Sequence, residues 1–212
     1  MTNLGKTKRE PLCNRRWLLR QGGLALPLLL AAPPARAAER AGAVEDVTGQ
    51  AFAEIDAVRR MLERAAPVFL GDDVGTGAAS RLGMQLGRNT KIRLGENARL
   101  KIDRFLVEAG GELTLREGPL LFDRPSRSAP AGVRIRSPFA LIAVRGTRFF
   151  AGPSNDRFGV FVARGSVSVS AAGQRVILHE GEGTDIASPG LPPTPVKRWG
   201  AQRINAALAS VS

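Results

Sequence analysis

SPFALIAVRGTRFF, residues 137–150, is the stretch that says most about how this chain folds. Its apolar run ends at Val144, is interrupted by polar residues and a glycine, and resumes at Phe149. A glycine inside a strand pattern marks a bulge or a close approach of another backbone. We therefore expect a strand corner with a structural role here, and a binding surface is the alternative. The residues of this motif are Arg145, Gly146, Thr147 and Arg148.

Apolar and polar residues alternate along most of the chain from about residue 81. Ile92 and Leu94, for example, alternate with Lys91 and Arg93. Such alternation puts one face of a strand on a core and the other in water. Glycine-containing turns separate the runs at short intervals, so we predict an all-β fold, a sandwich or β-roll of many short antiparallel strands or hairpins.

Two stretches of similar sequence indicate a faint internal repeat. GELTLREGPLLF begins at Gly111 and GVFVARGSVSVS at Gly159. Each has a strand pattern, an arginine, a glycine and a second strand pattern. We interpret them as two related hairpins stacked in one β architecture.

Two further segments have apolar residues at helical spacing. Residues 53–66 show this spacing and predict a helix. Residues 196–212 predict a short C-terminal helix, which follows a proline-rich connector at residues 188–195. We expect the Trp199 face of that helix to pack on the β core, because an apolar stripe usually marks a buried face.

The first 37 residues have the features of an export signal. A basic segment with the pair Arg15 and Arg16 precedes an apolar segment at residues 22–32, and ARA precedes an expected cleavage after Ala37. The apolar segment is too short for a membrane span, which needs about 20 residues. The arginine pair is similar to a twin-arginine signal, with an ordinary secretory signal as the alternative. We expect a periplasmic mature chain without a transmembrane helix.

The charge balance changes when this signal is left out. The full chain has a net charge of +12, and residues 1–37 contain seven Lys or Arg and one Glu, so the remainder carries +6. A modest positive charge on an exported protein favours anionic envelope material over nucleic acid, which we exclude as a partner.

Residues able to do chemistry are scarce. His179 is the only histidine, and Cys13, the only cysteine, lies in the export signal. Neighbouring residues on a strand point to opposite faces, so the adjacent pair Asp72 and Asp73 should diverge. The same argument applies to a cluster of potential metal ligands, His179, Glu180, Glu182 and Asp185. We therefore expect no catalytic residues, no metal and no cofactor, and we predict that the protein is not an enzyme.

The segment AVRGT, together with its surroundings, resembles a signature of the FecR domain family. The segments VTGQAF, LREGPLLF, GVFVARGSVSVS and RVILHEGEGTDI follow one another in an order similar to that family, over about residues 44–187. The resemblance implies a periplasmic all-β domain, here residues 38–187, and implies strand and turn over residues 53–66. In the best-known members this domain belongs to a transmembrane anti-sigma regulator that receives a signal from an outer-membrane transporter. We expect the present chain to lack the anti-sigma domain, because only 14 residues precede Arg15.

These observations predict a noncatalytic periplasmic module for interaction or sensing that binds another envelope protein. Strand addition at a sheet edge is one way in which such a module binds. The alternative is a protein that binds an envelope glycan or anionic polymer. It rests on the charge of +6 and on arginines in predicted strands, namely Arg81, Arg88, Arg93, Arg99, Arg134 and Arg136.

Overall fold

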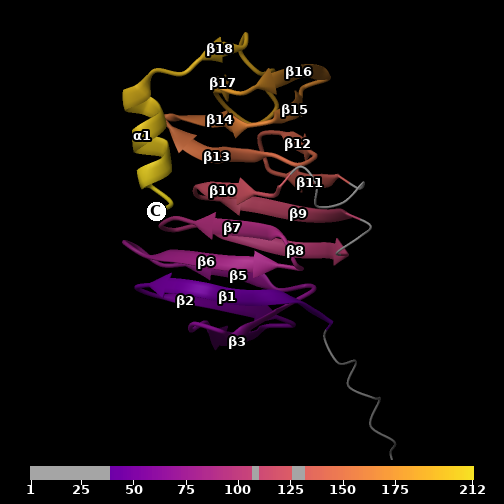
Figure 1. The fold of residues 1–212 in the computed structure, drawn as a ribbon, viewed down its shortest axis with the longest axis vertical. Coiled ribbons are helices and arrows are strands. Elements are labelled where there is room, and N and C mark those ends of the chain that lie inside the picture. Colours follow the sequence, from indigo (N-terminus) through magenta and orange to yellow (C-terminus); the bar gives the residue numbers. More distant parts are fainter. Residues whose placement is uncertain (1–38, 107–109, 126–131) are drawn as a thin grey trace, which may run out of the picture. The chain divides into compact units, whose positions relative to one another are not determined.

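The alternating segments fold into two nine-stranded sheets, which share one core (Figure 1). The computed structural model describes residues 39–106, 110–125 and 132–212, all within one compact unit. In spatial order, sheet A consists of β18 (Lys197–Arg198), β17 (Glu182–Ile186), β14 (Arg157–Arg164), β13 (Arg148–Ser154), β10 (Leu120–Asp123), β7 (Thr90–Leu94), β6 (Arg81–Leu86), β1 (Arg40–Thr48) and β4 (Pro67–Phe69). Sheet B consists of β16 (Gln174–His179), β15 (Ser166–Ala171), β12 (Leu141–Val144), β11 (Val133–Arg136), β9 (Gly110–Glu117), β8 (Arg99–Leu106), β5 (Asp73–Thr76), β2 (Ala51–Ile55) and β3 (Val58–Met61).

The chain passes repeatedly from one sheet to the other, so from β1 and β2 to β18 the strands in Figure 1 follow the sequence order; β3 and β4 lie at the opposite end, beyond β2 and β1. Nearly all neighbouring strands are antiparallel. Strands β9 and β11 are parallel, because the chain crosses into sheet A as β10 before it returns beside β9. The expectation of an all-β fold of short, mostly antiparallel strands is confirmed.

The core follows the alternation in the sequence. In β7, Ile92 and Leu94 are fully buried, whereas Lys91 and Arg93 are exposed. Phe122 of sheet A packs on Phe149, with ring centroids 5.4 Å apart. Burying apolar area contributes roughly 25 cal/mol per Å², so this shared interior is the main stabilising element of the domain.

Residues 53–66 do not form the helix that their apolar spacing predicts. Ile55 pairs with Val58 in the β2–β3 hairpin, and Asp56 (φ 49°) and Ala57 (φ 63°) form its two-residue turn. Strand β2 also pairs with β5, so its backbone is bonded on both sides. Val58 is 67% exposed, which shows that the helical stripe was not a buried face. Sheet pairing overrides local spacing here, as the family resemblance implied.

The two similar stretches are not hairpins. The first runs from β9 in sheet B through Gly118 (φ 78°) to β10 in sheet A. The second runs from β14 in sheet A through Gly165 (φ 87°) to β15 in sheet B. Each glycine therefore lies where the chain changes sheets. The left-handed conformation of glycine permits this sharp change of direction.

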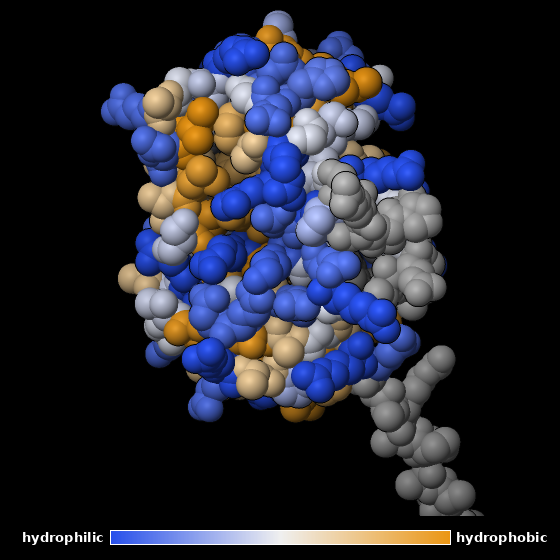
Figure 2. All heavy atoms as spheres, viewed as in Figure 1, coloured by the Kyte–Doolittle hydropathy of each residue, from blue (hydrophilic) through white to orange (hydrophobic). Residues whose placement is uncertain are grey.

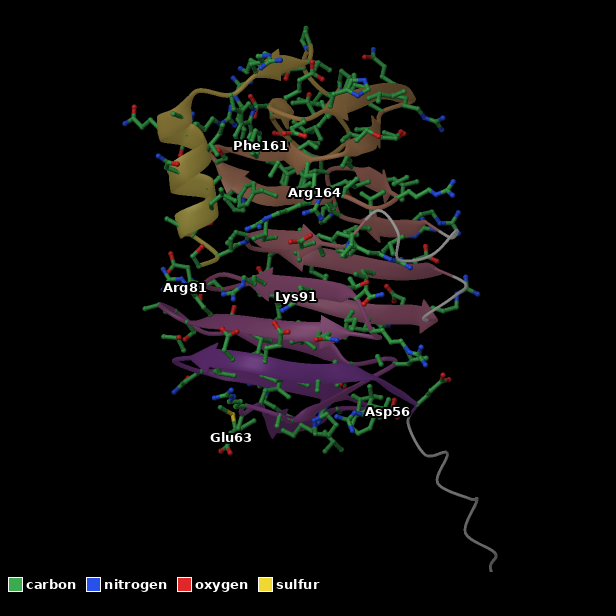
Figure 3. The ribbon with its side chains drawn as sticks, in the orientation of Figure 1. Asp56, Glu63, Arg81, Lys91, Phe161 and Arg164 are labelled. Atoms are coloured by element: carbon green, nitrogen blue, oxygen red, sulfur yellow. The ribbon has the colours of Figure 1, made fainter. Side chains whose placement is uncertain are left out.

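The predicted C-terminal helix is present but shorter than residues 196–212. Helix α1 spans Ala201–Ala209, because Lys197 and Arg198 form strand β18 and Gly200 is extended. The helix and Trp199 cover the outer face of sheet A over Leu121, Phe150 and Phe161. Figure 3 shows Phe161 close to α1, and Figure 2 shows hydrophobic surface beside this helix.

Within the part of the chain that the structure describes, no helix is long and apolar enough to cross a membrane. The expected export signal, with Arg15, Arg16 and the cleavage after Ala37, lies outside the described residues.

Candidate functional site

The segment from Ser137 to Arg148 consists of a turn, strand β12 and a corner, so its two ends lie at opposite ends of the strand. In the turn, the Ser137 hydroxyl oxygen accepts hydrogen bonds from the N–H groups of Phe139 (3.2 Å) and Ala140 (3.0 Å). This arrangement satisfies backbone groups that the β11–β12 hairpin leaves unpaired. It also holds Phe139 stacked on Phe158, with ring centroids 4.7 Å apart.

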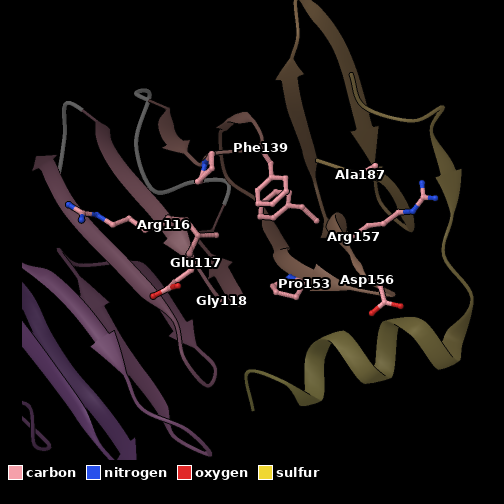
Figure 4. Close-up of a pocket in the computed structure, with 11 residues that line it drawn as sticks. Arg116, Glu117, Gly118, Phe139, Pro153, Asp156, Arg157 and Ala187 are labelled. Atoms are coloured by element: carbon pink, nitrogen blue, oxygen red, sulfur yellow. The ribbon is translucent and has the colours of Figure 1, made fainter. Parts of the chain in front are cut away.

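These two stacked rings form part of an open pocket of about 290 Å³ (Figure 4). The end of β9, the turn before β12 and the β13–β14 turn surround it. Its lining residues are Leu115, Arg116, Glu117, Gly118, Pro138, Phe139, Pro153, Asp156, Arg157, Phe158 and Ala187. The lining is therefore mostly apolar, with charged side chains contributed by the end of β9 and by the region of the β13–β14 turn.

The charged residues around the pocket do not form a catalytic arrangement. The Arg116 guanidinium lies 3.3 Å from the Asp73 carboxylate, and Glu117, Asp156 and Arg157 are exposed to solvent. Apolar sites with a few polar groups at the edge are typical of ligand and side-chain recognition. The pocket can thus accept an apolar group. The charged residues at its edge would favour a ligand that carries complementary charges next to that group.

At the other end of β12, the chain crosses from sheet B to sheet A at the motif predicted from sequence. Gly146 has φ 64° and is buried, and Thr147 is fully buried. The Arg124 N–H donates to the Thr147 carbonyl oxygen at 2.9 Å. A Cβ on Gly165 would lie 3.0 Å from both the Gly146 carbonyl oxygen and Thr147 Cγ2. Two sheet-changing corners therefore pack directly against each other.

The arginines of this motif differ in their contacts. Arg148 lies 3.7 Å from the Asp123 carboxylate, which also binds Arg164 at 2.7 Å. Arg145 is exposed and forms no ion pair with any residue that the structure describes. The Thr147 hydroxyl has no hydrogen-bond partner within the described ranges. Packing of its methyl group and the bond to its carbonyl hold this corner together.

The carboxylates considered from the sequence do not converge. Asp72 is buried, accepts the Phe69 N–H at 2.7 Å and binds Arg60; burial raises the pKa of its carboxyl, although these partners oppose the effect. Asp73 points instead to Arg116. His179 is exposed, and its backbone N–H, not its imidazole, donates to the Glu182 carboxylate at 2.8 Å. No group of three potential metal ligands occurs among the described residues.

Sequence reasoning missed the interaction that fastens the C-terminal segment. Arg203 stacks over the Trp199 ring, 3.6 Å from its centroid, and binds the buried Asp185 carboxylate at 2.5 Å. Burial opposes ionisation of Asp185, but Arg203 and Lys197 outweigh it and hold the pKa of this carboxyl below its usual value. The spacing of four residues between Trp199 and Arg203 was a usable signal, whereas Asp185, the ion-pair partner of Arg203 18 residues upstream, was not.

Acid should therefore loosen helix α1. A carboxyl whose folded pKa is depressed stabilises the fold above its unfolded pKa, here near 3.8, and this contribution disappears as pH falls through the folded pKa. We expect Asp185→Asn to weaken docking at pH 7 by about 1–3 kcal/mol, because a charge-assisted hydrogen bond is lost. The measurement is Trp199 fluorescence against pH in a Trp17→Phe background.

Asp123→Asn is the matched control, because Asp123 also pairs with two basic side chains, Arg148 and Arg164, neither of which belongs to α1. It should leave the Trp199 profile unchanged. Identical acid profiles for the wild type and Asp185→Asn would contradict the role assigned to Asp185.

The fold and these features define an all-β domain in which glycine corners carry the chain between two sheets and a signature segment links a buried corner to an apolar pocket. Residues 72–168 match the family described as FecR protein, which confirms the resemblance predicted from the sequence. The match is narrower than the residues 44–187 suggested by the sequence. It includes the turn that holds Phe139 and both packed corners.

Two crystal structures of a candidate anti-sigma factor from Parabacteroides distasonis ATCC 8503, at 1.65 and 2.50 Å resolution, have a similar fold. The TM-scores are 0.53 and 0.54, at 17% sequence identity. The alignments cover 64% of this chain and 64% and 63% of those chains, so the chain spans less than two thirds of their length. This likeness concerns the fold. None of the curated proteins matches the chain.

Proposed function

We propose that this protein is a noncatalytic, FecR-like interaction and sensing module that binds another envelope protein in the periplasm. The FecR domain and the likeness in fold to a candidate anti-sigma factor support a role in signalling. The periplasmic location rests on the export signal, with Arg15, Arg16 and cleavage after Ala37.

The observation that carries this proposal is the pocket beside Phe139. Pro138 and Pro153 are exposed at its edge, and Phe139 is only partly buried although it is a large apolar residue. A buried apolar group surrounded by a charged rim is the usual anatomy of a protein–protein contact. An apolar side chain of a partner would cover Phe139, while Arg157 and Glu117 would contact its neighbours.

The alternative, a glycan or anionic-polymer binder, is less well supported by the arrangement of charges. The arginines that suggested it are divided between the sheets, with Arg93 on β7 of sheet A and Arg134 and Arg136 on β11 of sheet B. Several are matched by carboxylates: Arg93 lies 3.7 Å from Asp46, and Arg136 binds Glu112. A polymer would need a continuous basic surface, so the protein-binding function ranks first.

The test is a crosslinking pull-down from envelope extracts with the tagged full chain, in wild-type form and as Phe139→Asp. A charge placed on the apolar contact should reduce recovery of the partner at least about tenfold, since hot-spot residues contribute 2 kcal/mol or more. Recovery by the wild type should survive high salt, because an apolar contact is not screened. A purely charge-driven interaction would weaken, since the Debye length falls from about 10 Å at 0.1 M to about 3 Å at 1 M.

Leu191→Asp is the matched control, because Leu191 is also an exposed apolar residue, at 47%, but lies outside the pocket. It should bind as the wild type does. Recovery of polymer alone, and only at low salt, would replace the proposed function by the alternative. Equal recovery by Phe139→Asp and Leu191→Asp would remove the pocket from the interface.

A further inference from the structure

The two sheets end in four edge strands, and the edge at β3 is blocked to further strands. Its residue Arg60 belongs to the face of sheet B that carries the buried Ala53, and it binds the buried Asp72 at 2.5 Å. An inward-pointing charge on an edge strand hinders the addition of another strand, because that strand would have to desolvate the charge.

Both edges of sheet A are also protected. Strand β4 has three residues and begins with Pro67, whose carbonyl oxygen accepts a hydrogen bond from Arg60 at 3.1 Å. At the other edge, β18 has two residues, and the connector continues alongside β17. There the Thr194 N–H donates to the Asp185 carbonyl oxygen at 2.9 Å. Short strands and covering segments are common ways to prevent edge pairing.

Strand β16 lacks such protection. It has six residues, QRVILH, and pairs with β15 along its whole length, while no strand of the described residues lies on its other side. It contains no proline and no inward-pointing charge, and its inward residue Leu178 is fully buried. Ile177, on the outer face, is 57% exposed. The backbone groups of an edge strand that point away from its neighbour can pair with an extended chain.

We propose that β16 receives an extended acidic segment of the partner protein as an additional strand of sheet B. This proposal rests on the proposed function and names the surface and the chemistry of its partner. Arg175, Ile177 and His179 alternate along β16 and are all exposed. An apolar residue opposite Ile177 and a carboxylate opposite Arg175 would complement this face, since opposite charges across strands are stabilising.

A second copy of this chain fits the same edge less well. An antiparallel pairing that places Ile177 opposite Ile177 would place Arg175 opposite His179 twice, so neither arginine would meet a carboxylate. The charge of +6 on residues 38–212 adds repulsion between copies. The charge of this edge therefore favours an acidic segment from another protein.

The probes are an eight-residue peptide of alternating Glu and Val and its counterpart of alternating Lys and Val. Hydrogen–deuterium exchange should show that the acidic peptide protects β16 amides of the full-length chain, while the basic peptide does not. Arg175→Glu and Ile177→Asp should each weaken binding of the acidic peptide about two- to fivefold, as expected for loss of a cross-strand pair. The matched controls on the other edge of sheet B are Arg59→Glu and Met61→Asp, which should bind normally.

Absence of protection at β16, or equal binding of both peptides, would overturn the proposal. A dimer in analytical ultracentrifugation that Ile177→Asp dissociates would also overturn it, because the occupant would then be a second copy. Capture of an envelope protein through the Phe139 pocket with β16 unprotected would refute strand addition and leave the proposed function intact. If no envelope protein is captured at all, the proposed function fails whatever the peptides do.

Discussion

Replacing Gly146 by valine is expected to lower the free energy of unfolding by about 3 kcal/mol or more. Gly146 has φ 64°, a conformation in which a β-branched residue is strongly disfavoured. It is also buried, and its carbonyl oxygen lies against the second corner at Gly165. Valine would therefore add backbone strain and excess volume at the point where the two sheets are joined. Urea denaturation followed by circular dichroism measures the loss.

Two further variants keep this prediction testable if Gly146→Val fails to fold. Gly146→Ala should fold and lose about 1–2 kcal/mol, the cost of a left-handed conformation for a residue with a Cβ. Gly173→Val is the matched control, because Gly173 has φ 76° in the β15–β16 turn and a Cβ there would meet nothing within 4 Å. It should lose less than Gly146→Val. Equal stability of Gly146→Val and the wild type would refute the corner role.

Trp199→Ala should release helix α1 from sheet A, with a loss of about 3–5 kcal/mol in its docking. The indole stacks on Phe161, with centroids 5.2 Å apart, and lies over Gly183 and Gly159. A Cβ on Gly183 would lie 2.3 Å from the indole nitrogen, so these glycines leave the space that the ring fills. A nine-residue helix without its packing surface is not stable in water, so we expect it to unfold.

The measurements are hydrogen–deuterium exchange of residues 201–211 and binding of an apolar dye, which should report exposure of Leu121, Phe150 and Phe161. Gln202→Ala is the control, because Gln202 is exposed on the same helix. It should keep both signals at wild-type values. Wild-type protection of the helix in Trp199→Ala would mean that the Arg203–Asp185 ion pair and the packing of Ala207 and Val211 hold it without the indole.

Variants at Gly146 and Phe139 distinguish the roles of the two ends of the signature segment. Gly146 lies in a corner where two crossings pack together, whereas Phe139 lies at the pocket and is partly exposed. Gly146→Val should therefore impair folding and binding together. Phe139→Asp should impair binding with a smaller loss of stability than Gly146→Val, since the ring is only partly buried although it stacks on Phe158.

Much of the fold was predictable because strand alternation is a local property. Ile92 and Leu94 are buried and Lys91 and Arg93 exposed, as the alternation predicted. The corner at Gly146 was also predictable, because a glycine that interrupts a strand pattern is a local signal. The divergence of Asp72 and Asp73 also followed from the geometry of a strand.

The wrong predictions concern segments whose structure depends on distant partners. Residues 53–66 have helical spacing, but β2 is fixed by pairing with β5 as well as β3. The similar stretches at Gly111 and Gly159 were taken for hairpins, although each changes sheets at Gly118 or Gly165. Local sequence can indicate a sharp turn, but it does not specify whether the following strand joins the same sheet.

By itself the sequence determined that this is an all-β domain, that its signature resembles the FecR family, and that a short helix follows the strands. Period-two alternation, glycine at a tight corner and a helical stripe are each encoded within a few residues. Only the tertiary structure decided the order of the strands, the pocket beside Phe139, the Asp185–Arg203 ion pair and the open edge at β16. Each of these depends on contacts between segments far apart in the chain. Bringing such segments together costs conformational entropy, which only the packing of the whole domain offsets.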